Sequence, residues 1–144
     1  MNDCIFCKIV KGDIPSIRIY EDRRVIAFMD INPVSEGHAL IIPKLHVENL
    51  WEIPEADLAA VHAASKKIVH AMRRALGHVS VAALQLNGKG VNQVVMHYHL
   101  HLIPRSGDGE ALKLTAWEMI PGDMEAIGRT GSAIAAAIET DKTQ

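Results

Sequence analysis

Three histidines alternate along one short stretch of this chain. His97, His99 and His101 lie within the apolar run from Met96 to Pro104. Because a strand points successive side chains to opposite faces, this spacing puts the three imidazoles on one face. A helix turns by about 100° at each residue and would spread them. The spacing therefore predicts a strand with chemistry on one face and, on the other, the apolar residues between the histidines packed into the core.

Three alternating imidazoles have three possible uses. They can be solvated side chains on a polar strand face, although three in register make this interpretation weaker than it is for a lone histidine. They can hold a catalytic zinc ion that keeps one position open for water. One of them can instead attack an acyl or phosphoryl centre as a neutral imidazole, while its neighbours orient it and manage protons.

A second set of metal-ligand types lies outside this run. Cys4 and Cys7 are the only two cysteines, and a Cys-x-x-Cys pair in a tight loop suits tetrahedral zinc. His46, just past a predicted strand, is a further isolated candidate, and a fourth ligand is still needed. A packed or redox-active cysteine pair is the alternative.

The hydrophobic pattern predicts the elements that must position these residues. Five short apolar runs predict strands, and between the third and the fourth, residues 58–76 repeat at intervals of three and four, which predicts a long helix covering one sheet face. A weaker helical pattern occupies residues 123–138. These elements predict an α+β fold with a largely antiparallel sheet. The predicted strands are Ile17–Tyr20, Val25–Met29, His38–Ile42, Ser80–Asn87 and the histidine run.

Length and charge limit the classes of function. A chain of 144 residues fits one domain. Fifteen basic residues are scattered among seventeen acidic ones, so we expect no nucleic-acid partner and no anionic membrane surface. No stretch has the length and apolarity of a signal peptide or a membrane span, which favours a cytoplasmic protein. Its partners are expected to be small molecules.

Several motifs together resemble one known family. His97–Ile103 is similar to the histidine triad signature of the HIT superfamily, and the rest of the chain resembles its Hint-like branch, of the bacterial zinc-containing type. The resemblance covers about residues 4–105 and leaves 106–144 as a C-terminal extension of a single HIT domain, 1–144. It implies a HIT-like fold with roughly five antiparallel strands, one long helix and a C-terminal helix. The other matching segments, in family order, are Cys4–Val10, Gly12–Pro15, Ala27–Ile31, Gly37–His46 and Asn87–Gly88.

The resemblance implies a two-step phosphoryl enzyme. His99 would attack the α-phosphorus of a purine nucleoside monophosphate conjugate, such as an AMP phosphoramidate, and water would then resolve the nucleotidyl-histidine intermediate. His101 would contact the phosphate, and His38 would join a proton relay around the leaving group. A dinucleoside polyphosphate hydrolase of the Fhit branch is one alternative, against which the cysteine pair argues. A nucleotide-binding or interaction module with weak hydrolysis is the other.

The resemblance also implies a metal, a binding surface and an assembly. One structural zinc ion per chain would be closed by Cys4, Cys7, His46 and His97, with no organic cofactor, and the protein would be a homodimer. For the apolar residues of the base site, ordinary core packing is the alternative, and for Asp30 the alternative is to cap a turn. The implied nucleotide-binding residues are Ile5, Phe6, Ile9, Phe28 and Ile31 around the base, Asp30 at the ribose hydroxyls, and Asn87 and Gln93 near the phosphate.

One segment departs from the family pattern. Asn92, Gln93 and Val94 stand where the family carries Gly-Gln-Ser or Gly-Gln-Thr. In Hint-like enzymes the hydroxyl is thought to assist the departing amine, and Val94 has no donor. Loss of one such donor costs on the order of 10²–10³ in rate. We therefore expect weak activity on phosphoramidates relative to family members that keep the hydroxyl.

Overall fold

The computed structural model describes residues 3–109 and 121–141. The chain forms two compact units, residues 1–111 and residues 112–144. The first unit holds the whole motif-bearing region predicted at 4–105. The second holds the C-terminal helix α3 (Met124–Asp141), which confirms the helix predicted at 123–138. That the whole chain is a single domain stays a prediction.

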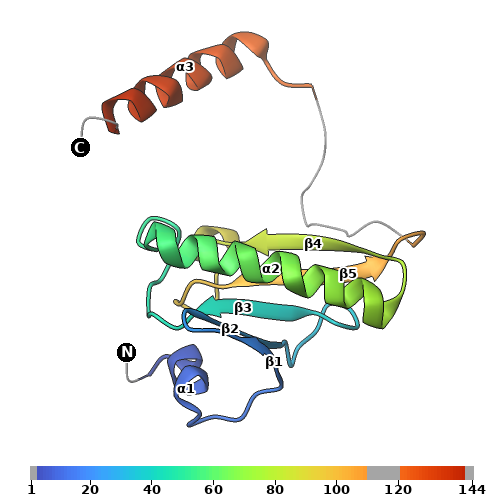
Figure 1. The fold of residues 1–144 in the computed structure, drawn as a ribbon. Coiled ribbons are helices and arrows are strands. Elements are labelled where there is room, and N and C mark those ends of the chain that lie inside the picture. Colours follow the sequence, from blue (N-terminus) through green and yellow to red (C-terminus); the bar gives the residue numbers. More distant parts are fainter. Residues whose placement is uncertain (1–2, 110–120, 142–144) are drawn as a thin grey trace. The chain divides into compact units, whose positions relative to one another are not determined.

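The first unit is built on one antiparallel sheet of five strands (Figure 1). The strand order is β1-β2-β3-β5-β4, and every neighbouring pair is antiparallel. This confirms the predicted α+β fold and places each predicted strand within a few residues of an observed one. The strands are β1 (Arg18–Glu21), β2 (Val25–Met29), β3 (Ala39–Pro43), β4 (Val79–Gln85) and β5 (Leu100–Ser106).

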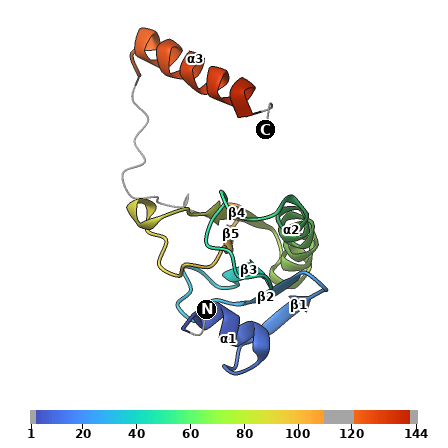
Figure 2. The ribbon, with the colours of Figure 1, turned by 90° about the vertical axis from the view of Figure 1, so that its left-hand side faces the viewer.

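Two helices cover opposite faces of the sheet (Figure 2). The long helix α2 (Glu55–Leu76) buries an apolar stripe on one face, as its three- and four-residue spacing predicts. The short helix α1 (Ile5–Lys11) lies on the other face. Alternation along β2 serves both, because Val25 and Ala27 pack with α2 whereas Ile26 and Phe28 pack with α1.

Helix α1 contradicts one local prediction. Cys4 and Cys7 were expected in a tight loop, but Cys4 is the residue that caps α1 and Cys7 lies in its first turn. The helix ends at Gly12, whose φ of 85° is in the left-handed region that glycine adopts without strain. Arg18 Nη2 donates to the carbonyl of Ile9 at 2.7 Å, which satisfies one of the last carbonyls of the helix.

The histidine run is a strand only in its second half. Strand β5 begins at Leu100, so His97 and His99 precede the sheet ladder and the strand predicted over the whole run is wrong there. Pairing with both neighbours stops at this level, where Ile41 of β3 and Gln85 of β4 both lie opposite Leu100. Strand β4 ends there, whereas β3 continues to Pro43 paired only with β2. The alternation nevertheless holds, since Tyr98, Leu100 and Leu102 are all buried in the core beneath α2.

Helix α3 is the described element of the second unit. Met124 and Ile127 are exposed on it, and Arg129 pairs with Glu125 one turn earlier at 3.4 Å. No helix within the described ranges combines the length and the apolarity needed to cross a membrane.

Candidate active site and metal centre

A cavity of about 530 Å³ lies against the α1 face of the sheet. Two of its wall residues, His99 and His101, come from the histidine run, and a third, His38, immediately precedes β3. Most of the remaining wall is apolar. It includes Ile5, Phe6, Ile9, Ile14, Phe28, Ile31, Val34, Leu40, Leu84, Leu86, Val94, Val95 and Ile103.

His97 lies outside this cavity and is completely buried. Its Nε2 is 2.8 Å from the carbonyl oxygen of Pro43. Because a carbonyl can only accept, Nε2 carries the proton of the neutral ring and Nδ1 carries a lone pair. Burial lowers the pKa of His97 to about 4, which keeps the ring neutral at physiological pH.

The lone pair of His97 faces three further ligand atoms. Its Nδ1 is 3.5 Å from Cys4 Sγ and 3.7 Å from Cys7 Sγ, and Cys7 Sγ is 3.2 Å from His46 Nδ1. A tetrahedral zinc ion with bonds of about 2.3 Å to sulfur and 2.0 Å to nitrogen puts these atom types about 3.5 Å apart. The four residues predicted as ligands are therefore brought together, with their ligand atoms all within 4.8 Å of one another, and their donor set fits a closed Cys₂His₂ site.

His99 has the tautomer that a nucleophile needs. Its Nδ1 donates to the carbonyl oxygen of His97 at 2.7 Å, so Nε2 holds the lone pair of the neutral ring. Burial lowers the pKa of His99, which favours that neutral form. The edge of the Phe6 ring packs against it, with centroids 5.2 Å apart. This imidazole can attack an electrophile in the cavity.

His38 and His101 form a hydrogen-bond chain with a fixed direction. The amide of Val34 donates to His38 Nδ1 at 3.0 Å, so the proton of His38 is on Nε2. That Nε2 lies 2.9 Å from His101 Nδ1, which must accept. The proton of His101 is consequently on its own Nε2, free for an anion. Burial, and then the neighbouring His99 and His38, lower the pKa of His101 to about 4.

Asp30 contacts His38 of this hydrogen-bond chain and also caps a turn. One of its oxygens accepts from the amide of Asn32 at 2.7 Å, so the turn-capping alternative is observed. The other oxygen lies 3.4 Å from His38 Nε2. Asp30, His38 and His101 are close enough to share a metal ion, but the Val34 amide keeps the proton on His38 Nε2 and so favours hydrogen bonding over coordination.

The residues predicted to surround a base all reach the cavity. Phe6 and Phe28 meet edge to face with ring centroids 5.5 Å apart, and Ile9 is buried beside them. Ile5 and Ile31 line the same wall but are exposed, Ile31 to 83%. The sequence interpretation missed Leu84 and Leu86, although their alternation within the predicted fourth strand is the signal that could have placed them on one face.

Asn87 and Gln93 are not among the cavity-lining residues. Gln93 is 3% exposed; its oxygen accepts from the Gly88 amide at 2.6 Å and its nitrogen donates to the carbonyls of Glu48 and Val95. The oxygen of Asn87 accepts from the amide of Leu50 at 2.7 Å. Both side chains therefore tie loops together, and a phosphate contact for either one stays a prediction.

Val94 is a wall residue of the cavity. It is 86% exposed and offers no hydrogen-bond donor where the family pattern carries a hydroxyl. The preceding Asn92 has a φ of 67°, a left-handed conformation that asparagine tolerates better than most residues and that suits the family's glycine. Asn92 can thus adopt the backbone conformation that suits the family's glycine, whereas the family's hydroxyl is absent at Val94.

A neutral imidazole with a free Nε2 at the wall of an apolar cavity is the arrangement that a histidine nucleophile requires. The family model named HIT domain matches residues 11–108, more than half of the chain. This protein belongs to the HIT family and is a hydrolase of HIT type.

Relatives and solved structures agree with this assignment. The adenosine 5′-monophosphoramidase of Saccharomyces cerevisiae is 39% identical over 136 residues, which cover 94% of this chain and 83% of that protein. The crystal structure of a histidine triad nucleotide-binding protein from Candida albicans superposes with a TM-score of 0.85 at 33% identity, covering 96% of this chain and 99% of that one. A zinc-bound histidine triad family protein from Mycobacterium smegmatis gives a TM-score of 0.73 at 35% identity, covering 97% and 98%.

Proposed function

We propose that the protein hydrolyses conjugates of purine nucleoside 5′-monophosphates at the α-phosphorus, with AMP phosphoramidates as the model substrate. The observation that carries the proposal is the His97 carbonyl bond, which leaves His99 with an Nε2 lone pair at the wall of the cavity. The yeast relative named as an adenosine 5′-monophosphoramidase supports the same chemistry.

The reaction has two displacements at phosphorus. In the first, a bond forms between His99 Nε2 and phosphorus as the phosphorus–nitrogen bond breaks, and the amine leaves with the electron pair and takes a proton from solvent. In the second, a water oxygen bonds to phosphorus, the histidine–phosphorus bond breaks, and that water returns one proton to solvent. The His97 carbonyl stabilises the positive charge of the intermediate imidazole because it accepts from Nδ1.

The other histidines position and stabilise the phosphoryl group. His101 presents an Nε2 proton to a phosphoryl oxygen as charge develops there. His38 holds that tautomer, since its own Nε2 proton occupies His101 Nδ1. His38 thereby controls the proton at the phosphate, and its expected part in a proton relay around the leaving group stays a prediction.

The nucleoside is proposed to bind at the α1 end of the cavity. Phe6 and Phe28 supply an aromatic corner, and the surrounding isoleucines supply flat apolar contacts for a purine. Asp30 keeps one oxygen beside the cavity with room for a ribose hydroxyl. The exposure of Ile31 is consistent with a residue that becomes covered when a base binds.

We further propose one structural zinc ion per chain, held by Cys4, Cys7, His46 and His97. When bound, it cross-links α1 to the segment that carries the nucleophile. Four protein ligands complete a tetrahedral shell, so its part is structural. The homodimer and the cytoplasmic location stay predictions, and sedimentation equilibrium would test the dimer.

Rapid-quench trapping of the adduct tests the proposed function. Wild-type protein mixed with radiolabelled AMP phosphoramidate is expected to carry label that is stable to denaturation, and His99→Gly is expected to carry none. Lack of adduct in the wild type would overturn the nucleophile assignment. If AMP still binds in that case, the result favours the alternative of a nucleotide-binding or interaction module with weak hydrolysis. Faster cleavage of diadenosine polyphosphates than of the phosphoramidate would favour the polyphosphate alternative.

A further inference from the structure

The cavity continues past the histidines to the outer edge of the sheet. Strand register aligns Phe28 of β2 with Leu40 of β3, Leu40 with His101 of β5, and His101 with Leu84 of β4. All four residues line the cavity. Neighbouring strands are about 4.8 Å apart, so the row runs from the aromatic corner through the phosphate-binding histidine to β4.

We call the part of the cavity on the α1 side of His101 its first lobe and the part on the β4 side its second lobe. A nucleoside held at Phe6 and Phe28 fills the lobe on the α1 side and brings its phosphorus to His99. The group that leaves phosphorus must then extend into the second lobe, on the β4 side. This orientation rests on the function proposed above.

The second lobe is apolar. Leu84 and Leu86 are two residues apart and face the cavity together, Ile103 adds a wall from β5, and Val94 stands at the solvent margin. We name Leu84, Leu86, Val94 and Ile103 the leaving-group wall. An apolar group placed against it is removed from water at a gain of about 25 cal/mol per Å².

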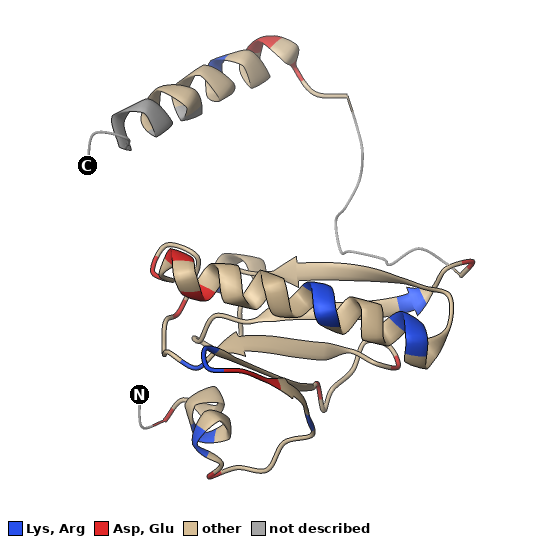
Figure 3. Cartoon of the chain, viewed as in Figure 1, with Lys and Arg blue, Asp and Glu red and all other residues tan. Residues whose placement is uncertain are grey.

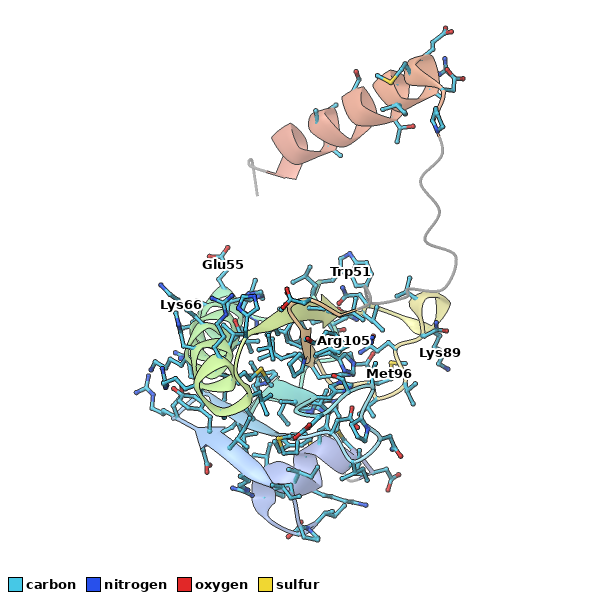
Figure 4. The ribbon with its side chains drawn as sticks, turned by 90° about the vertical axis from the view of Figure 1, so that its right-hand side faces the viewer. Trp51, Glu55, Lys66, Lys89, Met96 and Arg105 are labelled. Carbon is cyan, nitrogen blue, oxygen red and sulfur yellow. The ribbon has the colours of Figure 1, made fainter. Side chains whose placement is uncertain are left out.

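The cavity offers no cation to a second anionic group. Asp30 is the only Asp, Glu, Lys or Arg among the described residues that line it. Strand β4 carries no charged residue (Figure 3). Lys89, the first residue of the short 3-10 helix η1 (Lys89–Val91), points outward from the body of the unit (Figure 4). A further phosphate or sulfate would lose water against the leaving-group wall without a partner.

We propose that the leaving group of the natural substrate is uncharged and mainly apolar, an alkyl or aryl amine in place of a phosphate, a sulfate or another anion. Val94 is a specificity-determining residue for this choice. A hydroxyl at this position would be a donor that assists any amine. The Val94 side chain instead offers an apolar surface, which favours a particular class of leaving group.

A matched pair of substrates tests this proposal. The AMP phosphoramidates of phenethylamine and of its ring 4-sulfonate share the nucleoside, the scissile bond and an amine of similar basicity, and they differ in one remote charge. We expect kcat/KM at least tenfold higher for the uncharged conjugate. Val94→Lys, which places a cation at the margin of the wall, is expected to reduce this ratio about tenfold.

Val91→Lys is the matched control. Val91 is 49% exposed in the same loop region and does not line the cavity, so the same added charge is expected to leave the ratio unchanged. Equal kcat/KM values for the two conjugates in the wild type would overturn the proposal. If Val94→Lys and Val91→Lys change the ratio equally, Val94 is not a specificity-determining residue.

Binding separates this proposal from the proposed activity. The affinities of both conjugates for His99→Gly, measured by calorimetry, do not depend on turnover. Tighter binding of the uncharged conjugate supports the leaving-group wall even if the wild type cleaves neither compound, and that second result would overturn the proposed activity alone. Equal affinities of the two conjugates would overturn the proposal that the leaving-group wall selects an uncharged leaving group.

Discussion

Backbone groups decide what each histidine of the site can do. The Pro43 carbonyl orients His97 toward the candidate metal ligands, the His97 carbonyl frees Nε2 of His99, and the Val34 amide sets the direction of the bond from His38 to His101. Each of these backbone groups can only accept or only donate. Identical side chains therefore acquire different roles from their positions.

Restoring a hydroxyl at position 94 is expected to raise the rate. Val94→Ser supplies the donor that assists a departing amine, and we expect kcat on unsubstituted AMP phosphoramidate to increase by on the order of 10²-fold. This small substrate has no apolar group to contact the leaving-group wall, so the donor effect is measured by itself. Equal turnover by wild type and Val94→Ser would contradict the prediction, and Val94→Ala controls for the change in size.

The buried histidines make stability depend on pH. Burial lowers the pKa of His101 to about 4 from an ordinary value near 6.5. Between pH 4 and pH 6.5 the unfolded chain binds a proton at this residue that the folded chain excludes. The contribution of neutral His101 to the free energy of unfolding is therefore fully present above pH 6.5. It decreases as the pH falls toward 4, by about 3 kcal/mol for a pKa shift of that size.

Urea unfolding at pH 7 and pH 5 would measure this loss. His101→Gln is expected to show a smaller loss than the wild type, whereas His62→Gln, at an exposed site on α2, is expected to match it.

Because burial also lowers the pKa of His99, kcat/KM should stay level from pH 8 to pH 6.5 and decline only at lower pH. A decline that begins above pH 7 would argue against a buried neutral nucleophile.

At the scale of elements, loops bring the site together where the sheet ends. Gln93 joins the loop that contains Gly88 to the one that contains Glu48, and Tyr98 donates its amide to Val47 at 2.7 Å. These bonds hold the chain before β5, where no ladder partner is available to His97 or His99. The precision of the site thus depends on side chains that lie outside the cavity.

Gln93→Ala tests whether this residue acts through structure. The substitution removes a side chain that is 3% exposed and leaves the half-buried Gly88 amide and the Glu48 and Val95 carbonyls without this partner. We expect the free energy of unfolding to fall by about 1–3 kcal/mol. We also expect kcat to fall more than the affinity for AMP, because the triad loosens while the base site is untouched. A large loss of AMP affinity with unchanged stability would favour direct nucleotide contact. Gln85→Ala, which removes an amide from the same region outside the cavity, is the control.

At the scale of the whole molecule, the proposed metal centre draws its ligands from distant parts of the chain. Cys4 and His97 are 93 residues apart in sequence, and their ligand atoms are 3.5 Å apart. His97 supplies a ring to this centre and a carbonyl to His99, so ordering of one affects the other. The proposed metal centre would thereby connect the N-terminal helix to the segment that carries the proposed nucleophile.

Metal analysis is expected to find about one zinc per chain, lost in Cys4→Ser. Because the ion binds the folded chain and stabilises it by mass action, removal with a chelator should lower Tm in the wild type and have little effect in the variant. His70→Gln, at an exposed histidine of α2, should keep both the zinc and the Tm shift. Equal zinc content in the wild type and Cys4→Ser would exclude these ligands.

The sequence by itself determined the family, the α+β class and which side of each strand is apolar. These properties follow from local periodicity and from short motifs in a set order. His99 and the four candidate metal ligands could be named without a structure only through the family resemblance that those motifs carry. The sequence did not show that β5 starts only at Leu100, because that depends on where pairing with the neighbouring strands stops. It also did not show that Cys4 caps a helix.

Only the tertiary structure decided the tautomers and the shape of the cavity. The carbonyl of Pro43 and the amide of Val34 reach histidines 54 and 4 residues away, and no local pattern predicts such pairings. Leu84 enters the site because register places it opposite His101. Alternation states which side chains share a face, but the fold alone brings faces and backbone groups from different strands within hydrogen-bonding or van der Waals distance.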